Sequence, residues 1–312
     1  MTASSPILVT GAAGCIGAWV IARLAGAGRP AVAFDLSSDR RRLYLAMARE
    51  AADAVPWETG NIAADGALDG AIERHGIEAI VHLAALQIPF CIADPLAGAR
   101  VNVVGTVQVL EAARRHGIER LVYASSAAAL TASGQAGPST LYGVTKLADE
   151  GIARIYWQDW RVPSIGIRPH TVYGPGRDQG RTSAPSKAML AAAAGRPFAM
   201  PYDGTLSMQH VHEVADAFIR AADARVEGAF VGDLEGELAT VPEIVAAIRR
   251  IVPDADISVP DETISFSLDQ SDADLRRLVG EWPRVSLHDG TAMTIEAFGD
   301  LIGRGLVKPP DD

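Results

Sequence analysis

The sequence predicts an α/β protein built on a doubly wound parallel sheet, with a smaller, interleaved C-terminal lobe. Short apolar segments alternate with longer segments of helical periodicity, which is typical of consecutive βαβ units. The first apolar segment also ends in Gly11, Gly14 and Gly17 immediately before a helical segment. We expect strands at 7–10, 31–34, 78–83, 120–124 and 164–167. Helices are expected at 14–27, 39–53, 65–75, 95–115 and 139–160.

The alternation of strands and helices changes after about residue 170, where Gly174, Pro175 and Gly176 interrupt it. A helix predicted at 209–223 would return to the first domain. We therefore expect two parts that interleave along the chain. The predicted Rossmann-type domain covers 1–171 and 209–235, and the predicted substrate-binding lobe covers 172–208 and 236–312.

The composition restricts the classes of partner. The 312 residues are 48% hydrophobic and 21% charged, as in folded globular proteins. A formal net charge of −10 disfavours nucleic acids and anionic membranes, which bind clustered basic side chains. No long apolar stretch is free of charge, and no secretion signal is visible. Cys15 and Cys91 lack a metal-binding spacing, so we expect no metal site. Two cysteines without a disulfide framework indicate a cytoplasmic protein. From its charge and apolar pattern, we expect neither a membrane nor a nucleic acid as its partner.

The glycine-rich turn after the first strand predicts a site for a dinucleotide. Glycine lets the backbone approach a pyrophosphate closely, and the free N–H groups of the following helix favour negative charge. Asp35 ends the next apolar segment, where an acid can accept the hydroxyl groups of the adenosine ribose. This acid favours NAD, because it would repel a 2′-phosphate. The neighbouring Arg40, Arg41 and Arg42 leave NADP as the alternative.

Tyr142 and Lys146 are four residues apart on a predicted helix and therefore share one face. Tyrosine ordinarily ionises near pH ~10, and a shift of about three units corresponds to roughly 4 kcal/mol. An ammonium at about 4 Å supplies a comparable free energy at an effective dielectric near 20. A phenolate at Tyr142 could then accept the proton of a substrate hydroxyl while a nicotinamide accepts hydride.

Two serines, Ser125 and Ser126, end the predicted strand at 120–124. The carboxyl ends of parallel strands are where ligands bind in such sheets. A hydroxyl group at this edge can donate a hydrogen bond to the reacting oxygen. The alternative is that both serines only cap or turn the chain, as serine often does.

Taken together, these patterns resemble the extended short-chain dehydrogenase/reductase family, in its NAD-dependent epimerase/dehydratase group. The resemblance covers nearly the whole chain. The matching segments are Gly11/Gly14/Gly17, Asp35, His82-Leu83-Ala84-Ala85, Asn102, Gly105-Thr106, Ser125-Ser126, Tyr142 with Lys146, Arg168 to Pro175, Trp282 to Leu287, Gly290 and Thr294.

The resemblance implies roles for individual residues. Ser126 would orient the substrate, with Ser125 as an adjacent helper; Tyr142 would be the acid/base and Lys146 its electrostatic partner. Asn102 would brace the backbone of the site. The implied NAD-binding residues are Gly11, Ala13, Gly14, Cys15, Ile16, Gly17, Asp35, Leu36, Asn61, Ile62, Leu83, Ala84, Ala85, Ala124, Ser125, Tyr142, Lys146, Pro169, Thr171 and Val172.

Departures from the nucleotide-sugar members of the family indicate a small substrate. Thr171 stands where those members commonly have asparagine, and 206–209 replace their Arg-Asp pair. A diphosphate usually needs charge-assisted donors, for which Arg177 or Arg181 could serve; either could instead meet a carboxylate. We expect oxidation of a secondary alcohol or lactol carbon of a small sugar or sugar acid. The expected substrate contacts are Gln87, Ser125, Ser126, Tyr142, His170, Gln179, Ser183 and Gln209.

Two other functions stay open from the sequence. The first is a nucleotide-sugar (UDP-sugar) 4-epimerase, in which one tightly held NAD takes hydride and returns it to the opposite face of the sugar. The second is a non-catalytic dinucleotide-binding protein, which the intact Tyr142 and Lys146 pair disfavours. Free NADH accumulation with sugars would separate the dehydrogenase from the epimerase.

The resemblance also implies a homodimer formed through the helices at 95–115 and 139–160. An apolar face on the second of these helices is expected from Leu141, Ala148, Ile152, Ile155 and Tyr156. The same side chains could instead pack on the sheet. Their exposure in the structure distinguishes the two arrangements.

Overall fold

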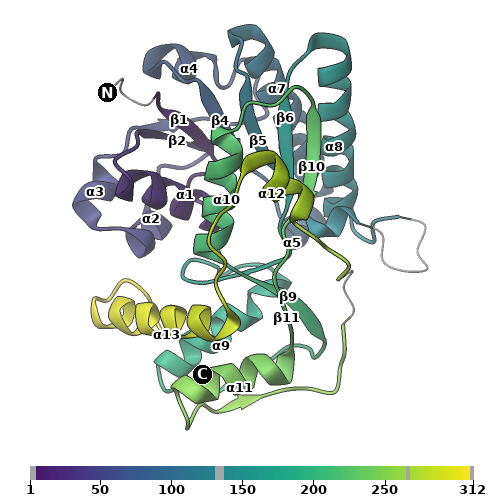
Figure 1. Cartoon of the computed structure of the whole chain (residues 1–312). Helices are drawn as coiled ribbons and strands as arrows, with labels where there is room; N and C mark the ends of the chain where they lie inside the picture. Colours follow the sequence, from purple (N-terminus) through teal and green to yellow (C-terminus); the bar gives the residue numbers. More distant parts are fainter. Residues whose placement is uncertain (1–4, 131–136, 265–267, 310–312) are drawn as a thin grey trace.

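A seven-stranded parallel sheet forms the centre of the structure, a computed structural model that describes residues 5–130, 137–264 and 268–309 (Figure 1). The strand order is β3-β2-β1-β4-β5-β6-β10, and the direction of winding reverses between β1 and β4. A crevice at the carboxyl ends of the strands is expected at this switch point. The strands are β1 (Ile7–Thr10), β2 (Ala31–Asp35), β3 (Trp57–Thr59), β4 (Ala79–His82), β5 (Arg120–Ala124), β6 (Ser164–Arg168) and β10 (Ala229–Asp233).

The predicted fold class is confirmed, and the five expected strands correspond to β1, β2, β4, β5 and β6 within a residue at each end. Two strands of the sheet were not expected. Strand β3 has only three residues and contains no apolar run. Strand β10 lies at the edge of the sheet, where Phe230 and Val231 are exposed, so it lacks the buried pattern of a central strand.

Helices cover both faces of this sheet, because successive side chains of a strand point to opposite faces. Ile7 and Val9 pack in a core with α1 and α10, whereas Leu8 packs on the other face with α4, α7 and α8. These helices are α1 (Cys15–Gly26), α4 (Asp69–His75), α7 (Gly105–His116), α8 (Leu141–Trp160) and α10 (Val211–Asp223).

Three of the expected helices differ from the structure. The segment 39–53 forms two helices, α2 (Arg41–Ala46) and α3 (Arg49–Asp53), because Met47 is extended with φ −153°. The segment 95–115 contains α6 (Pro95–Ala99) and a π-helical turn (Arg100–Val104) before α7 begins. The third helix starts at Asp69 rather than at 65.

A second, smaller core lies below the carboxyl edge of the main sheet in Figure 1. Its three-stranded sheet has the order β11-β9-β7, with Tyr173, Tyr202 and Met208 buried around it. Helix α13 packs against α9 and α11. The elements are β7 (Thr171–Tyr173), α9 (Ala184–Ala193), β8 (Phe198–Ala199), β9 (Thr205–His210), β11 (Glu237–Thr240), α11 (Val241–Ile251), β12 (Ile257–Ser258) and α13 (Leu287–Gly303).

Two segments lie differently from the expected interleaving. The helix expected from 209 begins at Val211, because 205–210 form β9 and His210 caps the helix through its ring Nδ1. Helix α12 (Ala273–Val279) was expected in the smaller lobe, but it packs on α10 and β10, and Leu275 and Trp282 join the core of the main sheet. We therefore propose the two parts expected from the sequence with one change. Residues 273–282 belong to the Rossmann-type domain and not to the smaller lobe.

Two glycines of α8 provide a matched test of the packing that positions this helix. A Cβ atom at Gly143 would lie 2.2 Å from the carbonyl oxygen of Ala128, whereas a Cβ at Gly151 would meet nothing within 4 Å. Gly143→Ala should lower the free energy of unfolding by about 2 kcal/mol, because overpacking against backbone cannot relax by a rotamer change. Gly151→Ala should be neutral or raise it by up to about 1 kcal/mol through helix propensity. Urea denaturation measures both, and equal effects would contradict the proposed close packing.

Candidate active site

A cavity of about 740 Å³ lies along the carboxyl ends of β1, β2, β4, β5 and β6. The structure brings most of the residues expected for the site to its wall. Those residues are Gly11, Ala13, Gly14, Cys15, Ile16, Gly17, Asp35, Leu36, Asn61, Ile62, Leu83, Ala84, Ala85, Gln87, Ala124, Ser125, Ser126, Tyr142, Lys146, Pro169, His170, Val172 and Gln179.

Three expected site residues, Thr171, Ser183 and Gln209, lie outside the cavity wall and are buried. The Gln209 amide accepts from the His170 N–H at 2.9 Å and donates to the Leu234 carbonyl at 2.7 Å. The Thr171 hydroxyl lies 2.9 Å from the His170 ring, and the Ser183 hydroxyl donates to the Gly180 carbonyl. The direct ligand contacts expected of these three residues therefore do not fit this structure.

The glycine turn between β1 and α1 forms a backbone cradle. Gly11 has φ +69°, and a Cβ there would lie 2.6 Å from the Ala84 nitrogen. A Cβ at Gly17 would lie 2.3 Å from the Gly11 carbonyl oxygen, so only glycine lets the helix start this close to the strand. Helix α1 begins at Cys15 with no side-chain cap at Gly14. The N–H groups of its first turn are thus available to a pyrophosphate.

The acid at the end of β2 is held in place by backbone donors. Asp35 accepts from the Ala13 N–H at 2.9 Å and from the Ser37 N–H at 3.3 Å. Its carboxylate therefore lies beside the glycine turn, where it suits the hydroxyl groups of a ribose.

The three neighbouring arginines are occupied elsewhere. Arg40 donates to the carbonyls of Ala52 and Val55, and Arg41 pairs with Asp39. Arg42 donates to the Ala13 and Gly176 carbonyls. It also pairs with Asp178, which is exposed. These partners remove the main argument for NADP, and the cradle with Asp35 fits NAD.

Tyr142 lies in the first turn of α8, whose N-terminus is capped by Thr140 through a 3.0 Å bond from the Gly143 N–H. Lys146 follows one turn later, and its ammonium lies 6.0 Å from the centre of the Tyr142 ring. Lys146 is 2% exposed. The pair expected from the sequence therefore forms on one face of the helix.

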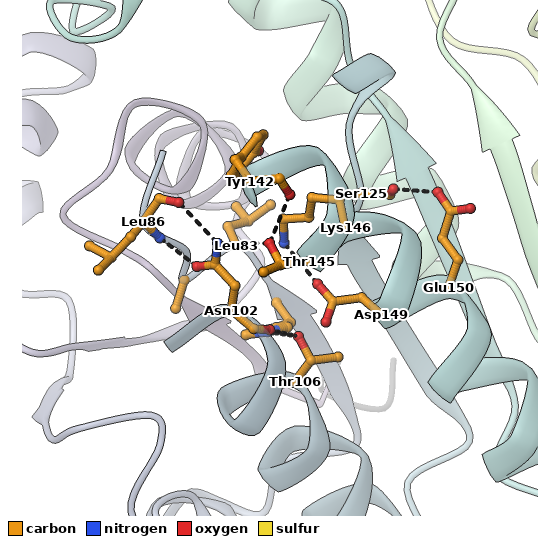
Figure 2. Close-up of polar contacts among 12 residues, drawn as sticks. Leu83, Leu86, Asn102, Thr106, Ser125, Tyr142, Thr145, Lys146, Asp149 and Glu150 are labelled. Carbon is orange, nitrogen blue, oxygen red and sulfur yellow. Dashed lines mark hydrogen bonds and ion pairs between the residues drawn. The ribbon is translucent and has the colours of Figure 1, made fainter. Parts of the chain in front are cut away.

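Asn102 ties the loop after β4 to the first turn of α8 (Figure 2). Its amide oxygen accepts from the Leu86 N–H at 2.7 Å, and its amide nitrogen donates to the Leu86 carbonyl and to the Thr145 hydroxyl. Thr145 in turn donates to the Tyr142 carbonyl at 2.7 Å. Asn102 thus braces the backbone, as its resemblance to the family implies.

The two serines after β5 have different partners. Ser125 donates its hydroxyl hydrogen to Glu150, which is paired with Arg168 at 2.6 Å (Figure 2). Ser126 instead accepts from the Ala128 N–H at 3.1 Å, so its own hydroxyl hydrogen remains available. Of the two, Ser126 can therefore donate to a substrate oxygen without losing a bond.

Buried ionisable groups lie beneath the site, and Asp149 among them was not expected from the sequence. Asp149 pairs with Lys146 at 3.2 Å, and burial raises the pKa of Asp149 to about 6. His82 lies between Thr10 and Thr106, and burial lowers its pKa to about 3, so it is neutral. The only sequence signal for Asp149 is its position three residues after Lys146 on the helix.

Within residues 5–130, 137–264 and 268–309, no group of three or more His, Cys, Asp or Glu side chains is arranged to hold a metal ion. In the same part of the chain, no helix has both the length and the apolar character required to cross a bilayer.

Comparisons with known proteins agree with this geometry. The UDP-glucose 4-epimerase of Mycolicibacterium smegmatis is 32% identical over 308 residues, covering 93% of this chain and 97% of that protein. The solved structure of MoeE5 in complex with UDP-glucose and NAD has a TM-score of 0.78 at 26% identity, covering 97% of this chain and 100% of that chain. A partial consensus L-threonine 3-dehydrogenase has a TM-score of 0.81 at 26% identity, covering 95% of this chain and 99% of that chain.

A family model described as the NAD dependent epimerase/dehydratase family matches residues 7–231. This match includes the glycine turn, Asp35, Ser126, Tyr142 and Lys146. The chain therefore belongs to the NAD-dependent epimerase/dehydratase family of the extended short-chain dehydrogenase/reductases, and its cofactor is NAD.

Proposed function

We propose that this enzyme oxidises a secondary alcohol or lactol carbon of a small sugar acid or sugar. Tyr142 accepts the proton of the substrate hydroxyl, and the Lys146 ammonium stabilises the phenolate. Ser126 donates a hydrogen bond that holds the reacting oxygen. NAD supplies the hydride acceptor.

The NAD-binding residues of this proposal are those expected from the sequence, without Thr171. The backbone of the glycine turn holds the pyrophosphate, and Asp35 accepts the hydroxyl groups of the adenosine ribose. Asn61 and Ile62 lie at the adenine end of the cavity, and Lys146 serves the nicotinamide ribose. Pro169 and Val172 shape the opposite end of the cavity wall.

One observation carries the choice of substrate. Four cationic side chains line the cavity, and three of them have carboxylate partners within the described residues: Arg42 with Asp178, Lys146 with Asp149, and Arg181 with Glu262. Arg177, the fourth, donates to the side-chain amide oxygen (Oε1) of Gln87 at 3.1 Å and to the Thr182 hydroxyl at 2.9 Å.

Arg177 therefore keeps an uncompensated positive charge at the cavity wall. Its Nε is buried and makes no hydrogen bond within the described residues. One guanidinium that has no carboxylate partner among the described residues suits one carboxylate of a ligand. A nucleotide diphosphate carries more charge than this single group compensates. A small sugar acid fits the available charge best.

The alternative is a nucleotide-sugar 4-epimerase, and one structural feature favours it. The loop at 174–178 lies over the glycine turn, where the Pro175 carbonyl accepts from the Trp19 indole at 2.9 Å and the Gly176 carbonyl accepts from Arg42 at 3.1 Å. A loop fastened in this way would slow the release of bound NAD. An epimerase needs such retention, because the same NAD must return the hydride.

We also propose that the protein is a homodimer, through a surface different in part from the expected one. Ile152 and Tyr156 pack in the core of the sheet and do not form the outer face. Large apolar side chains are instead exposed at Leu141, Val144 and Leu147 on α8, and at Ile92, Leu96 and Val104 on the neighbouring segment 88–104. Together they form the apolar patch that a second copy would cover.

Purified enzyme with added NAD should accumulate NADH with free sugar acids or sugars, measured as continuing absorbance at 340 nm. Tyr142→Phe should reduce kcat/KM by at least about 100-fold, because it removes the acid/base group. Its affinity for NAD, measured by calorimetry, should change little. Retained turnover in Tyr142→Phe would contradict the mechanism. About one NAD per chain after purification, with no NADH produced from any sugar, would favour the epimerase.

Arg177→Gln should distinguish charged from neutral substrates. We expect kcat/KM for D-galacturonate to fall by about 10-fold to 100-fold, the usual effect of removing a charge-assisted bond. The value for D-galactose in the same variant is the internal control and should stay within about 2-fold. Equal losses for both substrates together with a higher KM for NAD would mean that Arg177 serves the cofactor pyrophosphate instead.

Leu96→Glu should dissociate the dimer, because a carboxylate would be buried in the apolar patch. Light scattering on a sizing column should then give half the wild-type mass. Leu238→Glu changes an equally apolar, exposed residue on β11, outside the patch. A monomeric wild-type protein, or a dimer that survives Leu96→Glu, would refute the proposed surface.

A further inference from the structure

Asp149 is a fully buried carboxylate beneath the catalytic face of α8. It lies three residues after Lys146, and its Oδ2 is 3.2 Å from the Lys146 ammonium (Figure 2). The side chains are 0% and 2% exposed, respectively. The Lys146 ammonium, which the proposed reaction requires, is therefore paired with the Asp149 carboxylate, which has no role in the mechanism proposed above.

The surroundings make Asp149 depend on Lys146. Its Oδ1 is buried and has no hydrogen-bond partner in the part of the chain that the structure describes. The Thr106 hydroxyl of α7, which lowers the pKa of Asp149 somewhat, donates to the Asn102 carbonyl at 2.7 Å. A buried carboxylate with so few donors is stabilised mainly by its ion pair, and the pair restrains the ammonium in return.

The other titratable groups near Asp149 do not replace Lys146. His82 on β4 is neutral, since burial lowers its pKa. Tyr123 on β5 also remains neutral, because burial raises its pKa. Glu150, the next residue on α8, turns toward Ser125 and Arg168. Cys91, which interacts with Lys146, is also neutral because burial raises the pKa of its thiol. Among the described residues, Lys146 is thus the cation that compensates Asp149.

The carboxylate and a phenolate at Tyr142 would both be stabilised by the same ammonium. A negative charge already paired with Lys146 reduces the net positive potential at the phenol oxygen. Burial raises the pKa of Asp149 to about 6, so the carboxylate is ionised at neutral and alkaline pH. The Asp149 carboxylate and the Tyr142 phenolate therefore compete for the Lys146 ammonium at neutral and alkaline pH, where a tyrosine can act as a base.

We propose that Asp149 is a positioning residue that fixes the Lys146 ammonium beneath Tyr142 and, through its charge, sets the pH range in which Tyr142 acts as a base. This inference rests on the proposed acid/base role of Tyr142. Asp149 holds the Lys146 ammonium in place, but its negative charge opposes the formation of a phenolate at Tyr142. Neutralising Asp149 should therefore move the working range of the enzyme toward acid.

A titration that needs no substrate tests this inference. The absorbance of phenolate at 295 nm, measured against pH and corrected with the Tyr142→Phe variant, reports the ionisation of Tyr142 alone. In Asp149→Asn the midpoint should fall by about one pH unit, as expected for the loss of one nearby buried charge. With a substrate, the acidic limb of kcat/KM should move by the same amount. If Asp149→Asn does not fold, Asp149→Ser takes its place.

Two controls isolate the path through Lys146. Asp272→Asn removes a buried carboxylate that pairs with Arg276 and Arg284 away from the cavity, and it should leave the midpoint unchanged. In a Lys146→Met background, Asp149→Asn should lower the midpoint by less, because the part of its effect that acts through the ammonium is absent.

An unchanged or higher midpoint in folded Asp149→Asn would overturn the inference, as would a fall of the same size in the Lys146→Met background. A wild-type Tyr142 that ionises no earlier than free tyrosine would instead overturn the proposed function. The two failures are therefore distinguishable in one set of titrations.

Discussion

The reactive end of the site depends on one close backbone contact, where the first turn of α8 rests on the chain that follows β5. Only a glycine at position 143 lets the helix approach the Ala128 carbonyl this closely. The same short turn is capped by Ser126. The separation of Ser126 from Tyr142 is therefore set by backbone packing and not by flexible side chains. Reacting groups held in this way lose little entropy when a substrate binds.

The charges beneath the site are sorted by helix geometry. Asp149 and Glu150 are consecutive on α8, so their side chains leave the helix about 100° apart. One faces Lys146, and the other faces Ser125 and Arg168. Each buried carboxylate thus has a cation, without which its desolvation would cost several kcal/mol. In the pair of Glu150 and Arg168, Glu150 accepts the hydroxyl hydrogen of Ser125. The hydroxyl hydrogen of Ser126 remains available.

Most residues expected from the sequence gather at one cavity, because their signals depend on spacing along one element. The glycine turn, the acid at Asp35 and the Tyr142 and Lys146 pair are local signals, and the structure brings all of them to one cavity. Side-chain direction was not predictable in the same way. Gln209 and Thr171 lie next to the cavity in the chain but turn inward to support His170. Strand β10 escaped prediction because an edge strand is not buried on both faces.

The charge of a substrate can affect the loop at 174–178, because the ion pairs that line the cavity differ in exposure. The Lys146 and Asp149 pair is dry, whereas Asp178, the partner of Arg42, is 58% exposed. An exposed pair contributes about 1 kcal/mol or less, so an incoming phosphate could displace Asp178 easily. Arg42, however, also holds the Ala13 and Gly176 carbonyls. Recruiting Arg42 for a diphosphate would remove its bond to the Gly176 carbonyl and so loosen the loop over the glycine turn, which Trp19 would still hold through the Pro175 carbonyl. A nucleotide sugar would thus weaken the retention of NAD that an epimerase needs, whereas the single carboxylate proposed for the substrate would leave the Arg42 bonds intact.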